Sequence, residues 1–116
     1  MKAGRALAAL ALLAGAGCWR TTEAPEEHAL DVFEWAEADY AAHKYESAIT
    51  KYEYVIQHRS RWKEPYYKLA RCHEAMGKEE QGIRVLQQLL EVDPTDAQGK
   101  VELNRLQARV EAMRKS

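Results

Sequence analysis

From residue 28 onward, apolar side chains recur at the three- and four-residue spacing that places them on one side of an α-helix. The pattern predicts helices over 29–42, 44–57, 63–76, 79–91 and 95–114, and no segment shows the alternation of a strand. Asp93 before Pro94 is typical of an N-cap followed by proline at the first helical position. We therefore expect an all-α fold, with two helical hairpins and a C-terminal capping helix.

The two predicted hairpins repeat each other at an offset of 34 residues. Writing 29–62 above 63–96 needs no gap, and it pairs Ala36 with Ala70 and Ile49 with Ile83. Such repeats bury their apolar faces against one another, and about three are usually needed for stability. The final helix is therefore expected to cap the stack, although its exposed flank could instead pair with another copy or with a partner.

This period and these residue types resemble the tetratricopeptide repeat (TPR). In the second copy, Gly77 matches the glycine of the inter-helix turn and Gly82 the small residue where two helices touch, and Pro94 matches the closing proline. The first copy departs from the pattern at His43 and Ser60, where the family has glycine and proline. The resemblance implies a TPR-like domain over 28–116.

The first eighteen residues have the features of a bacterial targeting signal. Lys2 and Arg5 precede an apolar run over 6–17 that is too short to cross a bilayer, which takes about 20 residues. We interpret residues 1–17 as a cleaved signal peptide rather than a buried helix. Small residues before Cys18 resemble the lipobox of lipoproteins, although Gly15 stands where an aliphatic residue is usual.

The lipobox resemblance implies that Cys18 carries the lipid anchor and that residues 18–27 form the lipidated N-terminus and a tether. The alternative is a secreted protein cut nearby, with Cys18 a spare thiol. Trp19 is not the aspartate that retains lipoproteins in the inner membrane, so we expect the periplasmic face of the outer membrane.

The TPR resemblance also implies a groove lined by the first helix of each hairpin. Positions five, nine and twelve of each repeat then supply candidate partner-binding residues: Phe33, Glu37, Tyr40, Tyr67, Arg71 and Arg105. An apolar row beside charges suits a peptide or helix of another envelope protein. Alternatively, Phe33 and Tyr67 pack inside the superhelix. The Lys and Asn set with which the family grips C-terminal carboxylates is absent.

Charge is segregated along a chain whose net charge is only −1. Removing residues 1–17 leaves 15 basic against 18 acidic residues, a net charge of −3. Residues 23–39 hold seven acidic and no basic residues, whereas 58–71 hold five basic residues and Glu64, interleaved with Trp62, Tyr66 and Tyr67. Behind a signal peptide, nucleic acid is an implausible ligand. The remaining candidate ligands for the basic stretch are anionic lipid headgroups, peptidoglycan carboxylates or an acidic partner. The alternative is that the stretch is a solvated loop that faces the acidic first helix.

The residues that carry enzymatic or metal chemistry do not occur in the required spacings. The four histidines are about 15 residues apart, and no HExxH, CxxC or glycine-rich phosphate loop is present. Cys72, which aligns with Ala38 on the inner side of its helix, is expected to be a buried thiol. We therefore expect no enzyme activity, catalytic residue, cofactor or metal.

The expected function is that of a membrane-anchored adaptor or assembly factor in the bacterial cell envelope. The alternative is a structural component that self-associates.

Overall fold

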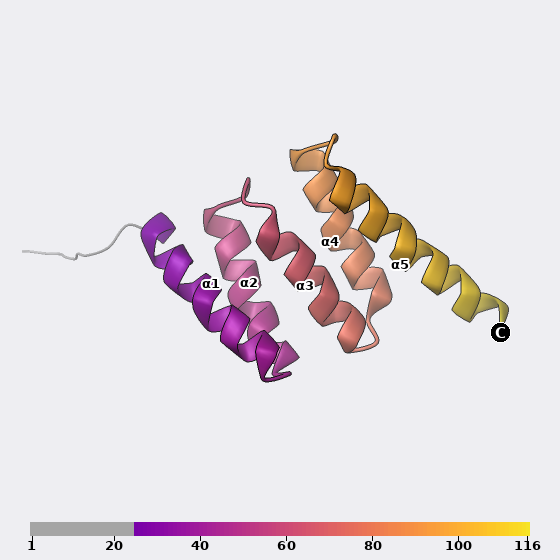
Figure 1. Cartoon of the computed structure of the whole chain (residues 1–116), viewed down its shortest axis with the longest axis horizontal. Helices are drawn as coiled ribbons and strands as arrows, with labels where there is room; N and C mark the ends of the chain where they lie inside the picture. The colour runs from indigo at the N-terminus through magenta and orange to yellow at the C-terminus, as the bar shows by residue number, and fades with distance from the viewer. Residues whose placement is uncertain (1–24) are drawn as a thin grey trace, which may run out of the picture.

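The computed structural model describes residues 25–116. The predicted signal peptide, the lipid attachment at Cys18 and the tether up to residue 24 lie outside the described residues. Within them the chain forms α1 (Pro25–Ala41), α2 (Tyr45–His58), α3 (Glu64–Ala75), α4 (Glu79–Val92) and α5 (Ala97–Lys115), and no strand (Figure 1). This confirms the all-α prediction, with TPR-like hairpins and a closing helix. Residues 25–27, which we assigned to the tether, belong to α1.

The helices stack as a row in which each contacts chiefly its neighbours in the chain. In Figure 1, α1, α3 and α5 lie side by side toward the viewer, with α2 and α4 behind them. The start of α1, the α2–α3 loop and the α4–α5 turn share one edge of the stack, and the other two turns lie at the opposite edge. In the part of the chain described, no helix is long and apolar enough to span a membrane.

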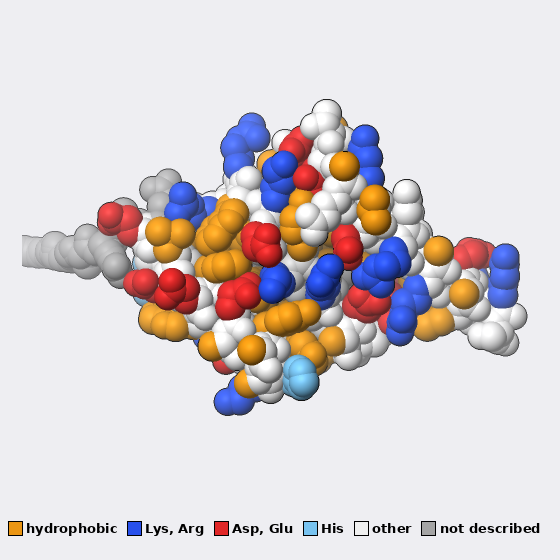
Figure 2. Space-filling model, in the orientation of Figure 1, with side chains coloured by type: hydrophobic (Ala, Val, Ile, Leu, Met, Phe, Trp, Pro, Cys, Tyr) orange, Lys and Arg blue, Asp and Glu red, His pale blue; other side chains and the backbone are white. Residues whose placement is uncertain are grey.

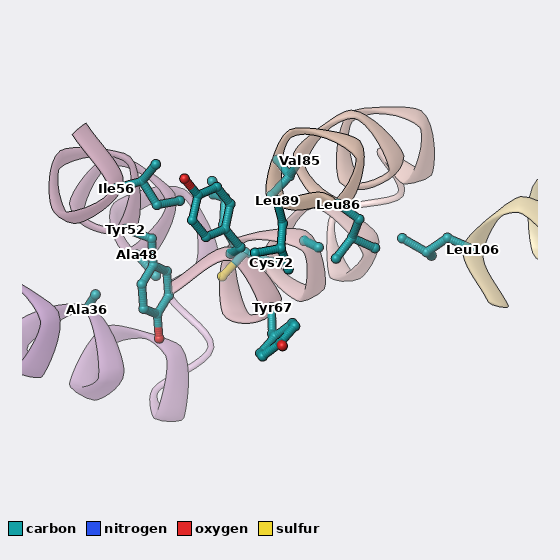
Figure 3. Close-up of a cluster of buried hydrophobic side chains, with 13 residues drawn as sticks. Ala36, Ala48, Tyr52, Ile56, Tyr67, Cys72, Val85, Leu86, Leu89 and Leu106 are labelled. Atoms are coloured by element: carbon teal, nitrogen blue, oxygen red, sulfur yellow. The ribbon is translucent and has the colours of Figure 1, made fainter. Parts of the chain in front are cut away.

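One apolar core runs through the stack from α1 to α5 (Figure 3). Tyr52, Leu86, Leu89 and Leu106 are almost completely buried in it. Burying each such side chain contributes about 1.5–3 kcal/mol, which is how short helices that are marginal alone become stable together.

Small residues allow the helices of a hairpin to approach each other closely. A Cβ at Gly82 would lie 3.1 Å from the Ala70 carbonyl oxygen on α3 and 3.0 Å from Leu106 Cδ1 on α5. The prediction that Gly82 marks a close helix contact is confirmed.

The two inter-helix turns have the same backbone geometry despite their different sequences. His43 and Gly77 both have positive φ, 61° and 75°. The amides of the next residues, Lys44 and Lys78, each donate to the carbonyl five residues earlier at 2.8 Å. This is the Schellman arrangement that ends a helix, and glycine is its usual centre because the left-handed region strains other residues. The first copy therefore keeps the family's turn, with His43 in the strained conformation.

The predicted N-cap of the last helix is wrong by three residues, and the helix begins at Ala97 rather than at residue 95. Asp96, not Asp93, is the N-cap of α5, and its carboxylate accepts a hydrogen bond from the Gly99 amide at 2.8 Å. The Asp93 carboxylate instead accepts from the Thr95 amide at 3.1 Å and closes the turn before the helix. Two aspartates flank Pro94, and only the three-dimensional turn decides which of them caps.

The outer side of α1 is not covered in the way that the equivalent side of α3 is. Leu69 and Cys72 on α3 are buried, whereas Trp35 and Ala38 at the equivalent positions of α1 are exposed, Trp35 to 52%. The buried state of Cys72 is confirmed, but the placement of Ala38 on the inner side of its helix was wrong. The reason is that, within residues 25–116, no helix precedes α1.

Candidate partner-binding groove

Acidic and basic side chains alternate in a band across the face formed by α1, α3 and α5 (Figure 2). Ion pairs join each of these helices to the next. The pairs are Glu37–Lys68 at 3.1 Å, Arg71–Glu102 at 3.4 Å and Glu74–Arg105 at 2.8 Å. Three of the predicted partner-binding residues, Glu37, Arg71 and Arg105, therefore lie together on this face, and each already has a partner within the chain.

Glu37 is the most occupied of the three. Its carboxylate accepts from the Lys68 ammonium at 3.1 Å and from the Tyr52 hydroxyl at 2.9 Å. Burial of the phenol, and then its hydrogen bond to Glu37, raise the pKa of Tyr52 well above its ordinary value. A carboxylate with two internal donors has little capacity left for a partner.

Phe33 and Tyr67 take part in packing. The Phe33 ring lies 4.3 Å from the Trp62 ring and 5.9 Å from the Tyr52 ring, centroid to centroid. Tyr67 is buried, and its hydroxyl donates to the Asp96 carboxylate that caps α5. The packing alternative therefore describes both side chains, and they fix the positions of α1, α3 and α5 rather than form an open surface.

The remaining predicted residues, Tyr40, Arg71 and Arg105, line one depression of about 490 Å³ together with Glu74, Ala75 and Arg109. Arg105 donates two hydrogen bonds to Glu74, both at 2.8 Å, in the fork geometry of a guanidinium on a carboxylate. Arg109 lies 3.8 Å from the same carboxylate and 3.2 Å from Glu79. The hydrogen bonds from Arg105 lower the pKa of Glu74, so this carboxylate is ionised near neutral pH.

The cations lie above the anions in this depression. The Arg71, Arg105 and Arg109 side chains are 44–52% exposed, whereas the side chains of Glu74 and Glu102 are 14–17% exposed. The guanidinium groups therefore offer their remaining N–H donors to solvent. Tyr40 adds a ring face, already contacted by the Lys68 ammonium at 4.9 Å. This arrangement can accept a carboxylate next to an apolar or aromatic side chain.

A sequence model of the tetratricopeptide repeat matches residues 39–110, which include every residue lining this depression. The chain belongs to the tetratricopeptide repeat family. No curated protein matches the chain. We call the face formed by α1, α3 and α5 the TPR face. TPR repeats generally mediate protein–protein interactions, so the class of ligand expected for this face is a protein or peptide.

Two residues of the TPR face were missed by sequence reasoning, although signals for both exist. Arg109 follows Arg105 by four residues and so lies on the same helix side. Lys68 lies 31 residues after Glu37, and the pairs Arg71–Glu102 and Glu74–Arg105 have the same separation. This separation of 31 residues is the repeat period less about one helical turn. Oppositely charged residues at this separation therefore predict ion pairs between the first helices of consecutive repeats.

The described part of the chain offers little for metal or thiol chemistry. No group of three or more His, Cys, Asp or Glu side chains there could hold a metal ion. Burial raises the pKa of the Cys72 thiol to about 11, so this thiol is protonated near neutral pH.

Proposed function

We propose that this TPR protein is a non-catalytic adaptor or assembly factor of the bacterial cell envelope, which binds an acidic peptide segment of another envelope protein. The observation that carries the proposal is the depression that Tyr40, Arg71, Arg105 and Arg109 line together. Aromatic and arginine side chains are the residue types that most often dominate binding energy at protein interfaces.

Within the depression, Arg71 is the residue most available to a partner. Its ion pair with Glu102 is long at 3.4 Å, and its side chain is 46% exposed. Arg105, by contrast, holds Glu74 with two short hydrogen bonds. A partner carboxylate that binds Arg71 therefore displaces little internal bonding, while the pair formed by Arg105 and Glu74 fixes the register of α3 and α5 beneath it.

Charge reversal at Arg71 tests this binding site. Arg71→Glu should reduce partner capture in cells at least tenfold, because it removes the available cation and repels a partner carboxylate. The matched control is Arg114→Glu, which reverses another exposed arginine in an ion pair, with Glu111 at 3.2 Å. Both variants should keep their helicity by circular dichroism. Equal capture by Arg71→Glu and Arg114→Glu would exclude the depression as the binding site.

The proposed location is the periplasmic face of the outer membrane, through a lipid on Cys18. Two or more acyl chains give stable anchoring, at about 0.8 kcal/mol per buried methylene. A Cys18→Ser chain should stay uncleaved at this site and lose its lipid, which mass spectrometry and membrane fractionation of the cells measure. Processing and fractionation unchanged from the natural chain would remove the anchor from the proposal.

A second candidate function, self-association as a building block, is supported by the uncovered side of α1. Trp35 and Ala38 are exposed there, at positions whose equivalents on α3 are buried. Size-exclusion chromatography with light scattering over a range of concentrations tests it, with Trp35→Gln as the variant that should shift the equilibrium toward monomer. A chain that is monomeric at every concentration would eliminate this second function.

A further inference from the structure

A second depression among the described residues lies away from the groove, at the edge where α1 begins. It measures about 780 Å³ and is lined by Glu27 and Leu30 of α1 and by the α2–α3 junction, residues 58–62. We call this surface the junction patch. Its exposed groups include the Arg59 and Arg61 side chains and Leu30, which is 46% exposed.

The two arginines of the junction patch differ from those of the groove in lacking acidic partners. Within residues 27–116 no carboxylate forms an ion pair with Arg59 or Arg61, whereas the groove arginines Arg71, Arg105 and Arg109 are all paired. Arg59 lies over the Trp62 ring, with its guanidinium carbon 5.6 Å from the ring centroid. In the described part of the chain, Glu27 is the acidic residue that lines the patch.

The junction is held rigidly in place. The Trp62 ring packs on Phe33 of α1 at 4.3 Å, and the hydroxyl of the buried Tyr66 donates to the Ser60 carbonyl oxygen at 2.7 Å. The Trp62 amide donates to the Arg59 carbonyl oxygen at 3.1 Å. Because the loop is already ordered, binding through Arg59 and Arg61 costs little additional backbone entropy.

We infer that the junction patch is a membrane-contact surface, on which Arg59 and Arg61 bind anionic phospholipid headgroups while Leu30 and Trp62 contact the interfacial region. The inference rests on the lipid anchor at Cys18 that is part of the proposed function. Arginine, tryptophan and leucine side chains are the groups that peripheral membrane surfaces combine. In the junction patch Leu30 is exposed and Trp62 is half-buried.

The position of the patch fits this contact. Six residues lie between Cys18 and Pro25, and the seven residue-to-residue steps of an extended chain reach at most about 25 Å. The anchor therefore keeps the start of α1, and with it the patch, near the lipid surface, so that even a weak contact has a high effective concentration.

Docking of the junction patch also gives the groove a defined orientation. Leu30 of the patch and Tyr40 of the groove are ten residues apart on α1, which corresponds to about 15 Å along the helix. Tyr40 lies at the end of α1 opposite the patch, and Ala75 of the groove at the same edge of the stack (Figure 1). A domain docked through the junction patch points its groove away from the membrane, toward a partner.

The test uses the chain from Cys18 onward, coupled through the Cys18 thiol to a maleimide phospholipid in vesicles. Substituting Trp19→Phe and Trp35→Phe leaves Trp62 as the reporter, and lipids with a nitroxide on the headgroup quench it on contact. Vesicles of phosphatidylcholine alone are compared with vesicles that also contain phosphatidylglycerol. Each arginine near an anionic surface is worth about 1 kcal/mol, so two should raise the docked-to-free ratio roughly thirtyfold.

The expected result is strong quenching of Trp62 only with phosphatidylglycerol, lost in high salt and in the double variant Arg59→Gln/Arg61→Gln. The matched control, Arg84→Gln/Lys100→Gln, removes two exposed cations elsewhere and should leave the quenching unchanged. Equal quenching in both kinds of vesicle, or quenching that survives Arg59→Gln/Arg61→Gln, would overturn the inference in favour of a protein partner or no ligand. Because the lipid is attached chemically, the result does not depend on lipidation in the cell, which the Cys18→Ser experiment measures separately.

Discussion

The contact between Gly82 and Leu106 offers a quantitative test of how the repeats pack. The equivalent residues one repeat earlier are Ala48 and Cys72, so a larger residue at one position accompanies a smaller one at the other. A Cβ on residue 82 would lie 3.0 Å from Leu106 Cδ1 and 3.1 Å from the Ala70 carbonyl oxygen. Leu106 is almost completely buried, so its side chain has little room to move.

We therefore expect Gly82→Ala to destabilise the domain, although alanine is the better helix former. Overpacking costs about 1–3 kcal/mol, and the helix-propensity gain of alanine over glycine offsets about 1 kcal/mol of it. The net loss should be about 1 kcal/mol, which corresponds to a fall of about 4–8 °C in Tm for a domain of this size. Thermal and urea denaturation followed by circular dichroism measure it.

A double-mutant cycle with Leu106→Val isolates the contact. Leu106→Val alone should destabilise by about 1–3 kcal/mol through the cavity that it leaves. Adding Gly82→Ala to that variant should then be neutral or stabilising, because the new methyl group enters the vacated space. Equal losses from Gly82→Ala in both backgrounds, or a gain in the natural chain, would refute this account of the packing.

Three further predictions concern single residues. Gly77→Ala should destabilise the domain by about 1 kcal/mol, as measured by chemical denaturation. Because φ is 75° and no atom lies within 4 Å of the added Cβ, this cost comes from the backbone alone. An unchanged free energy of unfolding would contradict the turn geometry. Hydrogen bonds from Lys63 and Thr95 lower the pKa of Asp93 to about 2. The stability that Asp93 contributes should therefore be present above its unfolded pKa of about 4 and be lost as pH falls toward 2. An Asp93→Asn chain that loses as much stability as the natural chain between about pH 4 and pH 2 would contradict this. In a Cys18→Ser chain, Cys72 should react with a thiol reagent at pH 8 only as fast as the domain opens, and rapid labelling of the folded protein would show that the thiol is not buried.

The sequence predicted the fold closely because each helix depends on a local pattern. The apolar period set the helices to within a few residues, and the 34-residue offset set their order. Gly82 and Gly77 were predictable because a close helix contact and a left-handed turn both select glycine. The cap at Asp96 was not, since its carboxylate also accepts from Tyr67, which is 29 residues away.

The groove was only half predictable, because a residue's position on a helix does not reveal what neighbouring helices place against it. Repeat positions correctly brought Tyr40, Arg71 and Arg105 to one depression. They gave no indication that Trp62 covers Phe33. The ion pairs Glu37–Lys68, Arg71–Glu102 and Glu74–Arg105 all have a separation of 31 residues. That separation indicates ion pairing only once the arrangement of the helices in the superhelix is known.

The central claim, that the groove binds a partner, is tested most directly by photocrosslinking in cells. A photoreactive residue replaces Ala75, which is exposed and lines the depression, or Gln88, which is exposed on α4. The account predicts one discrete crosslinked envelope protein with the Ala75 chain, lost when Arg71→Glu is added, and none with the Gln88 chain. The same crosslink from both positions, or a crosslink at Ala75 that survives Arg71→Glu, would contradict it.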